Sequence, residues 1–422
     1  MKLFVILCLV SCILFFLSCE KSTTPLTSSK VVLTVEYVGV SEAELHLQLY
    51  SSQPYNALQL LRDGQTVLSA ALSATDTTLR DTALLPAHSY TYQAALFDNG
   101  GRSLVSNELT LTTLDTSSHD YVWTINTFGN FNSSLYDVFA IAEDDVWAVG
   151  KIDTGSNQPF NAIHWDGHNW DLERIYAITS LGDTSRGPIT AIFAFSTDDI
   201  WTFSYAGSYS YFDGNSWISE FVDERVGSIN KIWGNSSSDI YFIGTNGNIT
   251  HYNGEIWHNV ESGTQLRLTD IWGLSENDIY VVGADMSSPD NVVLHYDGTS
   301  WYHLATDQNR KVGVWGISPD NLYFAGDGVY HYDGKNYHLI DWPAGIPHIF
   351  SQCVRGSQPN NVFVVGDFGL VLHFNGSSWK GYTDLLNPSG TVLKSISIAD
   401  SSVFVVGSAD YKGIVIHGRK QN

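Results

Sequence analysis

Short segments in which apolar and polar residues alternate run through most of this chain, and in its last three hundred residues they recur as one phrase about every forty residues. In one copy, Ile232-Trp233-Gly234 is followed by Asp239-Ile240-Tyr241, by His251-Tyr252-Asn253-Gly254 and by Trp257. The next copy begins at Ile271. Alternation with a period of two is typical of β-strands that bury one face. A phrase repeated at this spacing is typical of solenoids and propellers, so the pattern predicts an all-β repeat protein.

Each copy contains four segments of strand length, separated by turn residues. The third segments carry, in order, His164, Tyr211, His251, His295, His331, His373 and His417. The fourth segments follow Asp-Gly or Asn-Gly and centre on Trp170, Trp217, Trp257, Trp301, Tyr337 and Trp379. Four antiparallel strands in seven successive copies predict a seven-bladed β-propeller over residues 121–418. The Asp-Gly and Asn-Gly pairs predict two-residue hairpins with positive φ at both central positions.

The last copy stops near His417 and lacks the fourth segment that bears the tryptophan. A stray segment of that kind, Tyr121-Val122-Trp123-Thr124-Ile125, stands just before the first complete copy. We expect this N-terminal strand to complete the C-terminal sheet, which would close the ring and leave no open sheet edge there.

Residues 31–114 carry shorter alternating runs with turns at Asp63-Gly64 and Asn99-Gly100-Gly101, which predicts a β-sandwich. The stretch Leu85-Pro86-Ala87-His88-Ser89-Tyr90 resembles the segment that leads to the tyrosine corner of fibronectin type III modules. The core tryptophan usual in the second strand of those modules is replaced by leucines. The region is therefore predicted to be fibronectin III-like.

The N-terminus reads as a bacterial lipoprotein signal. Lys2 precedes an apolar run from Leu3 to Leu17 that is too short to span a bilayer, so residues 1–18 are predicted to be a signal peptide. Phe16-Leu17-Ser18-Cys19 resembles a lipoprotein cleavage box, with Cys19 as the lipid attachment site; Cys12 is the alternative. Residues 19–30 would form a lipidated tether. Cleavage leaves Cys353 as the one remaining thiol, which its apolar surroundings predict to be buried and inert.

Charge and composition exclude some partners. The chain has 44 acidic and 21 basic residues and a formal net charge of -23, which argues against nucleic acid. The repeated acids Asp145, Asp199, Asp239 and Asp278 precede strands and are predicted to bond backbone amides of the preceding loops. A calcium site is the alternative, although each repeat offers one isolated acid. The repeated histidines are predicted to be packing or hydrogen-bonding groups between blades rather than metal ligands. The repeated tryptophans are predicted to pack between blades, and no cofactor is predicted.

The connections predict where function lies. Those between strands one and two, and between three and four, are nearly constant in length, whereas the others vary and all lie at the opposite end of the sheets. The long ones are Lys151 to Phe160, Arg174 to Pro188, Ala284 to Asn291 and Thr383 to Thr391. Variable loops on a rigid scaffold are typical of a binding face. The ligand-binding candidates on that face are Arg174, Tyr176, Arg186, Trp342, His348 and Phe368.

The repeat resembles those of bacterial lipoproteins with Trp-Gly-x-Ser-x-x-Asp-Val-Tyr-x-Val-Gly and His-Tyr-Asp-Gly-x-x-Trp phrases, some of which are labelled glucosyltransferases. No segment here resembles a sugar-nucleotide site or a catalytic triad, and no catalytic residue is assigned. We expect a monomeric, lipid-anchored protein of the bacterial cell envelope, at the outer membrane or cell surface. It would bind a glycan or a protein through the variable face without catalysis. The alternatives are a carbohydrate-active enzyme with acids over the propeller tunnel, and a scaffold for envelope complexes.

Overall fold

The computed structural model describes residues 29–101, 103–156, 158–222, 227–386 and 389–421. The chain forms two compact units, and each is described by itself. Of the described residues, one unit contains those of 29–38, 42–83 and 89–112, and the other contains those of 39–41, 84–88 and 113–421. The predicted signal peptide, Cys12 and Cys19 lie outside the described residues. No helix of the described part is both long and apolar enough to cross a membrane.

The first unit consists of two antiparallel sheets. One contains β1 (Lys30–Val38), β2 (Glu42–Tyr50) and β5 (Asp76–Thr82) in the order β1-β2-β5. The other runs β4-β3-β6-β7 with β8 also paired to β6, and comprises β3 (Ala57–Arg62), β4 (Gln65–Ala71), β6 (Ser89–Phe97), β7 (Ser103–Val105) and β8 (Leu109–Thr112). Alternate residues of these strands, such as Leu45 and Leu47, or Tyr92 and Leu96, are fully buried, as a period-two pattern requires.

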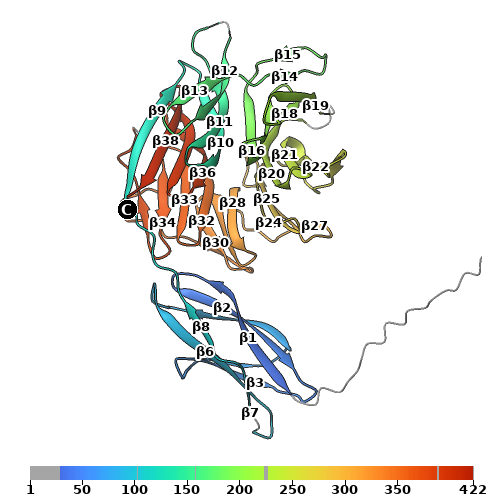
Figure 1. Ribbon diagram of the computed structural model, residues 1–422, viewed down its shortest axis with the longest axis vertical. Coiled ribbons are helices and arrows are strands. Elements are labelled where there is room, and N and C mark those ends of the chain that lie inside the picture. The colour runs from blue at the N-terminus through green and yellow to red at the C-terminus, as the bar shows by residue number, and fades with distance from the viewer. Residues whose placement is uncertain (1–28, 102, 157, 223–226, 387–388, 422) are drawn as a thin grey trace, which may run out of the picture. The chain divides into compact units, whose positions relative to one another are not determined.

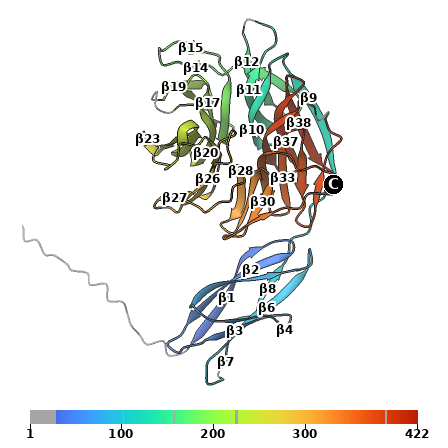
Figure 2. The ribbon, with the colours of Figure 1, turned by 180° about the vertical axis from the view of Figure 1, so that it is seen from behind.

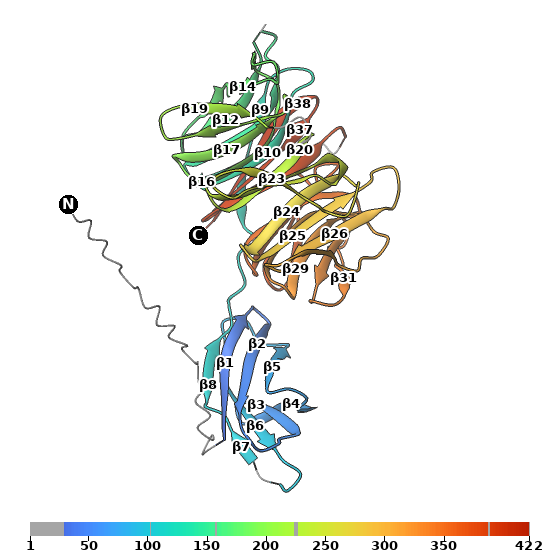
Figure 3. The same ribbon diagram turned by 90° about the vertical axis from the view of Figure 1, so that its right-hand side faces the viewer.

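The second unit contains seven four-stranded antiparallel sheets within its described residues (Figure 1). The first sheet is β10 (Ser134–Ala142), β11 (Asp145–Ile152), β12 (Phe160–Trp165) and β13 (Trp170–Glu173). The second is β16 (Ile189–Ser196), β17 (Asp199–Ser204), β18 (Ser208–Phe212) and β19 (Trp217–Phe221). The third is β20 (Ile229–Ser236), β21 (Asp239–Gly244), β22 (Ile249–Tyr252) and β23 (Trp257–Val260). The fourth is β24 (Leu268–Ser275), β25 (Asp278–Ala284), β26 (Asn291–Tyr296) and β27 (Trp301–His303), three of which lie side by side in Figure 3.

The remaining sheets follow the same order along the chain. The fifth is β28 (Lys311–Ser318), β29 (Asn321–Gly326), β30 (Val329–Tyr332) and β31 (Tyr337–Leu339). The sixth is β32 (Ser351–Gln358), β33 (Asn361–Gly366), β34 (Val371–Phe374) and β35 (Trp379–Gly381). The seventh is β36 (Val392–Ala399), β37 (Ser402–Ala409), β38 (Lys412–Lys420) and β9 (Tyr121–Phe128). A small hairpin, β14 (Ala177–Ile178) with β15 (Thr184–Ser185), and a 3-10 turn at Thr245–Gly247 lie in connections.

The first strands of these sheets contact one another in a closed cycle, β10-β16-β20-β24-β28-β32-β36 and back to β10. This is the arrangement of a β-propeller, as the repeats predict. The last and first sheets share a hydrophobic core in which Phe404 and Val415 pack with Leu135 and Val138.

The strand before the first repeat completes the last sheet, as predicted. β9 pairs with β38 from Tyr121 opposite Lys420 to Phe128 opposite Gly413, and the two strands lie together in Figures 1 and 2. Trp123 takes the place of the missing fourth-strand tryptophan: its ring lies 6.4 Å from that of Phe363 on the second strand of the sixth sheet. The same contact between neighbouring sheets joins Trp217 to Trp147 and Trp301 to Tyr241. The tryptophans therefore pack between sheets, as expected.

The turns between third and fourth strands differ from the prediction. They are four-residue connections, 166–169, 213–216, 253–256, 297–300, 333–336 and 375–378, in which only the glycine has positive φ. The side chain of the first residue caps the turn; Asp166 Oδ1, for example, accepts hydrogen bonds from the amides of His168 (2.7 Å) and Asn169 (2.6 Å). Because that carboxylate replaces the tight hairpin bonds, the aspartate can keep ordinary φ.

The repeated acids also have other partners than predicted. The carboxylates of Asp145, Asp239 and Asp278 accept hydrogen bonds from third-strand histidines of their own sheets, rather than from loop amides. His251 Nε2, for instance, lies 2.6 Å from Asp239 Oδ1, and its ring stacks at 4.1 Å on Tyr241. These three histidines therefore act as hydrogen-bonding groups within their own sheets. The rings of His373 and His417 also contact neighbouring sheets, at 5.4 Å from Tyr121 and 5.8 Å from Trp165. Within the described chain, no group of three or more His, Cys, Asp or Glu side chains could hold a metal ion.

The sixth sheet carries a variant of this pair. His373 is fully buried, contacts Asn361 Oδ1 at 3.0 Å, and meets His119 Nδ1 at 2.8 Å through its own Nδ1. In a neutral His373 ring that donates from Nε2 to the Asn361 oxygen, Nδ1 accepts a hydrogen bond from His119. Burial, helped by the neighbouring His119 and lysine charges, lowers the pKa of His373 to about 3.

Candidate ligand-binding site

The uniform and the variable connections lie at opposite ends of the sheets, because successive strands are antiparallel. The variable end bears the connections between second and third strands and those between sheets. A cavity of about 600 Å³ opens there, since Tyr205, Thr245 and Met286 of three such second-to-third connections line it. The cavity thus lies at the face on which the sequence predicts function.

β-Bulges in the first strands shape this cavity. Each first strand shows a register shift near its start, and the extra residue lines the cavity in every described sheet: Tyr136, Thr190, Asn230, Thr269, Val312, Gln352 and Lys394. A bulge redirects a side chain that would otherwise alternate between the two faces of a sheet. The bulges therefore bring polar side chains, such as Thr190, Asn230 and Gln352, into a cavity wall formed by largely apolar strands.

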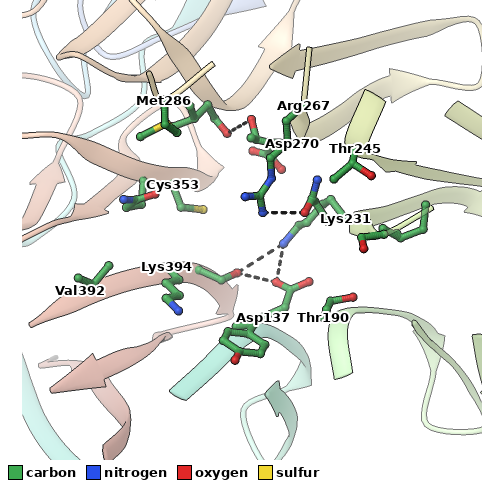
Figure 4. A pocket seen from close by; sticks show the side chains of 18 of the residues that line it. Asp137, Thr190, Lys231, Thr245, Arg267, Asp270, Met286, Cys353, Val392 and Lys394 are labelled. Atoms are coloured by element: carbon green, nitrogen blue, oxygen red, sulfur yellow. Dashed lines mark hydrogen bonds and ion pairs between the residues drawn. The ribbon is translucent and has the colours of Figure 1, made fainter. Parts of the chain in front are cut away.

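Asp137 and Lys231 form one buried ion pair in this wall. The Lys231 Nζ lies 2.5 Å from Asp137 Oδ1, and the Ser395 hydroxyl donates to the same oxygen at 2.7 Å (Figure 4). The amides of Val138 and Ile192 also donate to the carboxylate, at 3.0 and 3.1 Å. Four donors from four different sheets thus hold Asp137, which is 2% exposed.

Asp270 and Arg355 form a second pair. The guanidinium donates to both carboxylate oxygens, at 2.8 and 2.7 Å, and the Val314 amide donates to Oδ2 at 2.9 Å. Arg355 Nη1 also donates to the carbonyls of Val314 and Val354. Burial alone would lower the pKa of Arg355, but the charge of Asp270 outweighs it and raises that pKa.

Two further cations, Lys394 and Arg267, line the cavity, and no carboxylate of the described residues forms an ion pair with either. Lys394 Nζ contacts the Ser134 hydroxyl at 3.0 Å and lies 4.5 Å from the centre of the Tyr136 ring. Arg267 donates to the amide oxygen of Asn230 at 2.7 Å. Burial, and then the charge of Arg267, lower the pKa of Lys394.

Exposed aromatic and apolar side chains stand at the same end. Phe131, which precedes β10, packs against Tyr411 of the β37–β38 turn with ring centres 4.7 Å apart. Tyr205, Met286 and Phe368 lie in second-to-third connections and are 69%, 54% and 59% exposed. Large side chains of this kind on a rim of loops are typical of interaction surfaces.

The structure distributes the predicted candidates over separate connections. Arg174 stacks on the Phe160 ring at 3.5 Å and donates to the Gln158 carbonyl. Arg186 lies 5.0 Å from the ring centre of Tyr176, in the connection between the first and second sheets. Phe368 has positive φ, 55°, at the tip of the β33–β34 turn.

Trp342 and His348 lie in the connection between the fifth and sixth sheets, with their rings stacked at 4.7 Å. Trp342 is only 9% exposed, and its ring belongs to the hydrophobic core that contains Trp315 and Leu372. Trp342 thus anchors its loop, and His348 covers one side of it. None of the six candidates lines the cavity.

Sequence reasoning missed the cavity residues themselves. Their signal is a break in the repeat: Asp137, Lys231 and Asp270 stand two residues before Phe139, Trp233 and Trp272, where the second repeat has Ala191 and the fifth has Gly313. Cys353 occupies the same place in the sixth sheet and is buried, as predicted; burial raises the pKa of its thiol.

No family model matches this chain, and no curated protein matches it. Its fold is similar to that of solved structures. YCF48 bound to a D1 peptide superposes with a TM-score of 0.56 at 18% identity, over 72% of this chain and 98% of that one. YCF48 from Cyanidioschyzon merolae gives 0.53 at 12% identity, over 70% and 98%. The WD40 β-propeller domain of Doa1 gives 0.54 at 12% identity, over 72% and 98%. These similarities show that most of the chain has a β-propeller fold.

Proposed function

We propose that this chain is a non-catalytic binding protein whose propeller holds a segment of a partner protein at the variable end. The observation that carries this proposal is the cavity of about 600 Å³, which opens among variable loops and is lined in part by the exposed side chains of Tyr205 and Met286. A volume of this size lies in the range of ligand pockets, roughly 300 to 1,000 Å³.

Binding accounts for the cavity better than the alternative of a carbohydrate-active enzyme. Glycoside cleavage needs two carboxyl groups with oxygens directed at the substrate. The carboxylates that line the cavity, Asp137 and Asp270, already accept bonds from Lys231 and Arg355 and from backbone amides. Their hydrogen bonds hold neighbouring sheets together, so a role in the wall of the cavity explains them.

A protein ligand is favoured over a glycan by the chemistry of the rim. Phe131, Tyr205, Phe368 and Met286 offer flexible apolar and aromatic contact area, while the cavity wall offers amide and hydroxyl groups suited to a peptide backbone. The similar YCF48 structure holds a D1 peptide, which supports a peptide-binding use of this fold.

We also propose roles for the parts of the chain outside the cavity. The seven sheets would be the seven blades of a ring closed by β9, and residues 31–114 would be a fibronectin type III-like spacer. That spacer is supported by two antiparallel sheets and by the buried Tyr90. Cys19, on the tether 19–30, would fix the protein to a membrane of the bacterial envelope, with residues 121–418 as the binding domain.

The lipid anchor predicts a labelling result. In cells fed radiolabelled palmitate, the protein should incorporate label, and Cys19→Ala should abolish incorporation because the acylated thiol is gone. Cys12→Ala is the matched control and should keep the label. Loss of label in Cys12→Ala alone would move the anchor to Cys12, and an unlabelled native protein would rule an anchor out.

The binding face predicts a second result. Purified protein should enrich peptides from a displayed library of random sequences, and Tyr205→Ala or Phe368→Ala should weaken the selected peptides about tenfold, because interface aromatics commonly contribute more than 1 kcal/mol. Affinity is measured by fluorescence anisotropy.

Ile256→Ala is the control for the rim variants, since Ile256 is 62% exposed in a turn at the uniform end. It should leave affinity unchanged. Equal weakening by Ile256→Ala, or binding on a glycan array with no peptide enriched, would contradict the proposal.

A further inference from the structure

The cavity wall carries more positively charged than negatively charged side chains. Asp137 is neutralised by Lys231, and Asp270 by Arg355. Lys394 and Arg267 remain, and within the described residues no carboxylate lies within ion-pair distance of either one. In Figure 4 Lys394 stands apart from the Asp137 and Lys231 pair. A local excess of positive charge therefore lies inside a chain whose formal net charge is -23.

We infer that Lys394 and Arg267 bind a carboxylate group of the partner inside the cavity at the variable end. The inference rests on the proposed peptide-binding function and adds to it a chemical class: the bound segment carries an aspartate, a glutamate or a chain terminus at this point. The site is built, since Lys394 lies on a β-bulge that directs it to the cavity, and Tyr136 and Ser134 fix its stem and ammonium.

The energetics favour an anion here. A half-buried ammonium that contacts one hydroxyl and one aromatic ring keeps only part of the stabilisation that water would give it. A carboxylate would supply a charge-assisted hydrogen bond, which is about twice as strong as a neutral one. Arg267 is exposed at the cavity entrance, where its charge would attract an acidic segment before binding.

Specificity follows from the same arrangement. The net negative charge of the chain repels acidic partners in general. A carboxylate is therefore attracted only where cations such as Lys394 and Arg267 make the local electrostatic potential positive. The neutral wall groups, including Thr190, Asn230 and Gln352, leave hydrogen-bonding capacity for the peptide backbone next to it. The cavity would therefore select acidic segments from among many peptides.

The test compares two fluorescein-labelled peptide pools that differ only in having glutamate or glutamine at fixed positions. Native protein should bind the glutamate pool about tenfold more tightly in fluorescence anisotropy, a difference of about 1.4 kcal/mol. Lys394→Met and Arg267→Gln should each remove most of this preference while keeping affinity for the glutamine pool. Methionine fills the space of the lysine stem, and Arg267→Gln changes an exposed residue, so at least this second variant should fold.

Lys335→Met is the matched control, because Lys335 is exposed in a turn at the uniform end. It should keep the preference for glutamate. Equal binding of both pools to native protein would overturn the carboxylate inference and leave peptide binding intact. Failure of both pools to bind would remove both proposals. Stronger competition by inorganic phosphate than by acetate would overturn the carboxylate assignment in favour of a phosphoryl ligand.

Discussion

Replacing Trp123 by alanine is expected to lower the free energy of unfolding of the propeller by about 3 kcal/mol, the lower end of the range for buried aromatic truncations. The indole contacts Phe363 of the sixth sheet, lies 4.9 Å from the Tyr382 ring, and covers Gly418 of β38. A Cβ at Gly418 would stand 2.4 Å from the indole, so the glycine allows this close approach. Loss of the ring would leave a void between the last two sheets.

The loss of stability should be largest in the seventh sheet, where β9 pairs with β38. β9 is the only described partner of β38 on that side of the seventh sheet, so weakening it opens the edge of β38. Amide hydrogen exchange in residues 413–420 should therefore accelerate more than exchange in the third sheet, and urea denaturation followed by circular dichroism should report the loss of stability.

Val122→Ala is the control for Trp123. Val122 is the neighbouring residue on β9, points to the other side and is 51% exposed, so its truncation should change stability by less than about 0.5 kcal/mol. If the two variants were equally stable, or if amide exchange in β38 were no faster in Trp123→Ala, then Trp123 of β9 would not hold the ring closed.

The pairing of β9 with β38 was predictable because each repeat contains the same four segments, so a missing segment can be recognised. The fourth segment of each copy has a tryptophan after a turn, the last copy lacks one, and Trp123 is the unassigned tryptophan of the same kind. The all-β fold and the position of the variable loops at one end of the sheets follow from the same repeat and from the antiparallel order of strands.

The cavity could not be predicted in the same way, since it depends on bulges. Period-two alternation assigns Asn230 and Lys231 to opposite faces, but the extra residue in β20 shifts the register and brings both to the cavity wall. The partners of these residues are also remote in sequence: Lys231 pairs with Asp137 of the first sheet, and Arg355 with Asp270 of the fourth. The loop candidates do not lie together either. Trp342, for example, packs into the hydrophobic core, which its position in a loop did not reveal.

The pair of Asp270 and Arg355 gives the other large expected effect. Asp270→Asn should lower the free energy of unfolding by about 3 to 5 kcal/mol, because it leaves a buried guanidinium facing a neutral amide. Arg355 is 9% exposed, and its contacts with Val314, Val354 and Asp270 hold the fourth, fifth and sixth sheets together. Urea denaturation followed by circular dichroism measures the loss.

Two comparisons separate the cost of an unpaired charge from general damage to the sheet. The double variant Asp270→Leu with Arg355→Met removes both charges and should recover much of the stability, since apolar replacements of a buried pair are often neutral. Asp327→Asn breaks the pair of Arg310 and Asp327, whose side chains are 24% and 27% exposed, and should cost less than about 1 kcal/mol. A double variant no more stable than Asp270→Asn would show that packing around the fourth sheet, and not charge pairing across the three sheets, is what Asp270 provides. Equal losses in the free energy of unfolding for Asp270→Asn and Asp327→Asn would show that burial does not make the Asp270–Arg355 pair more important for stability.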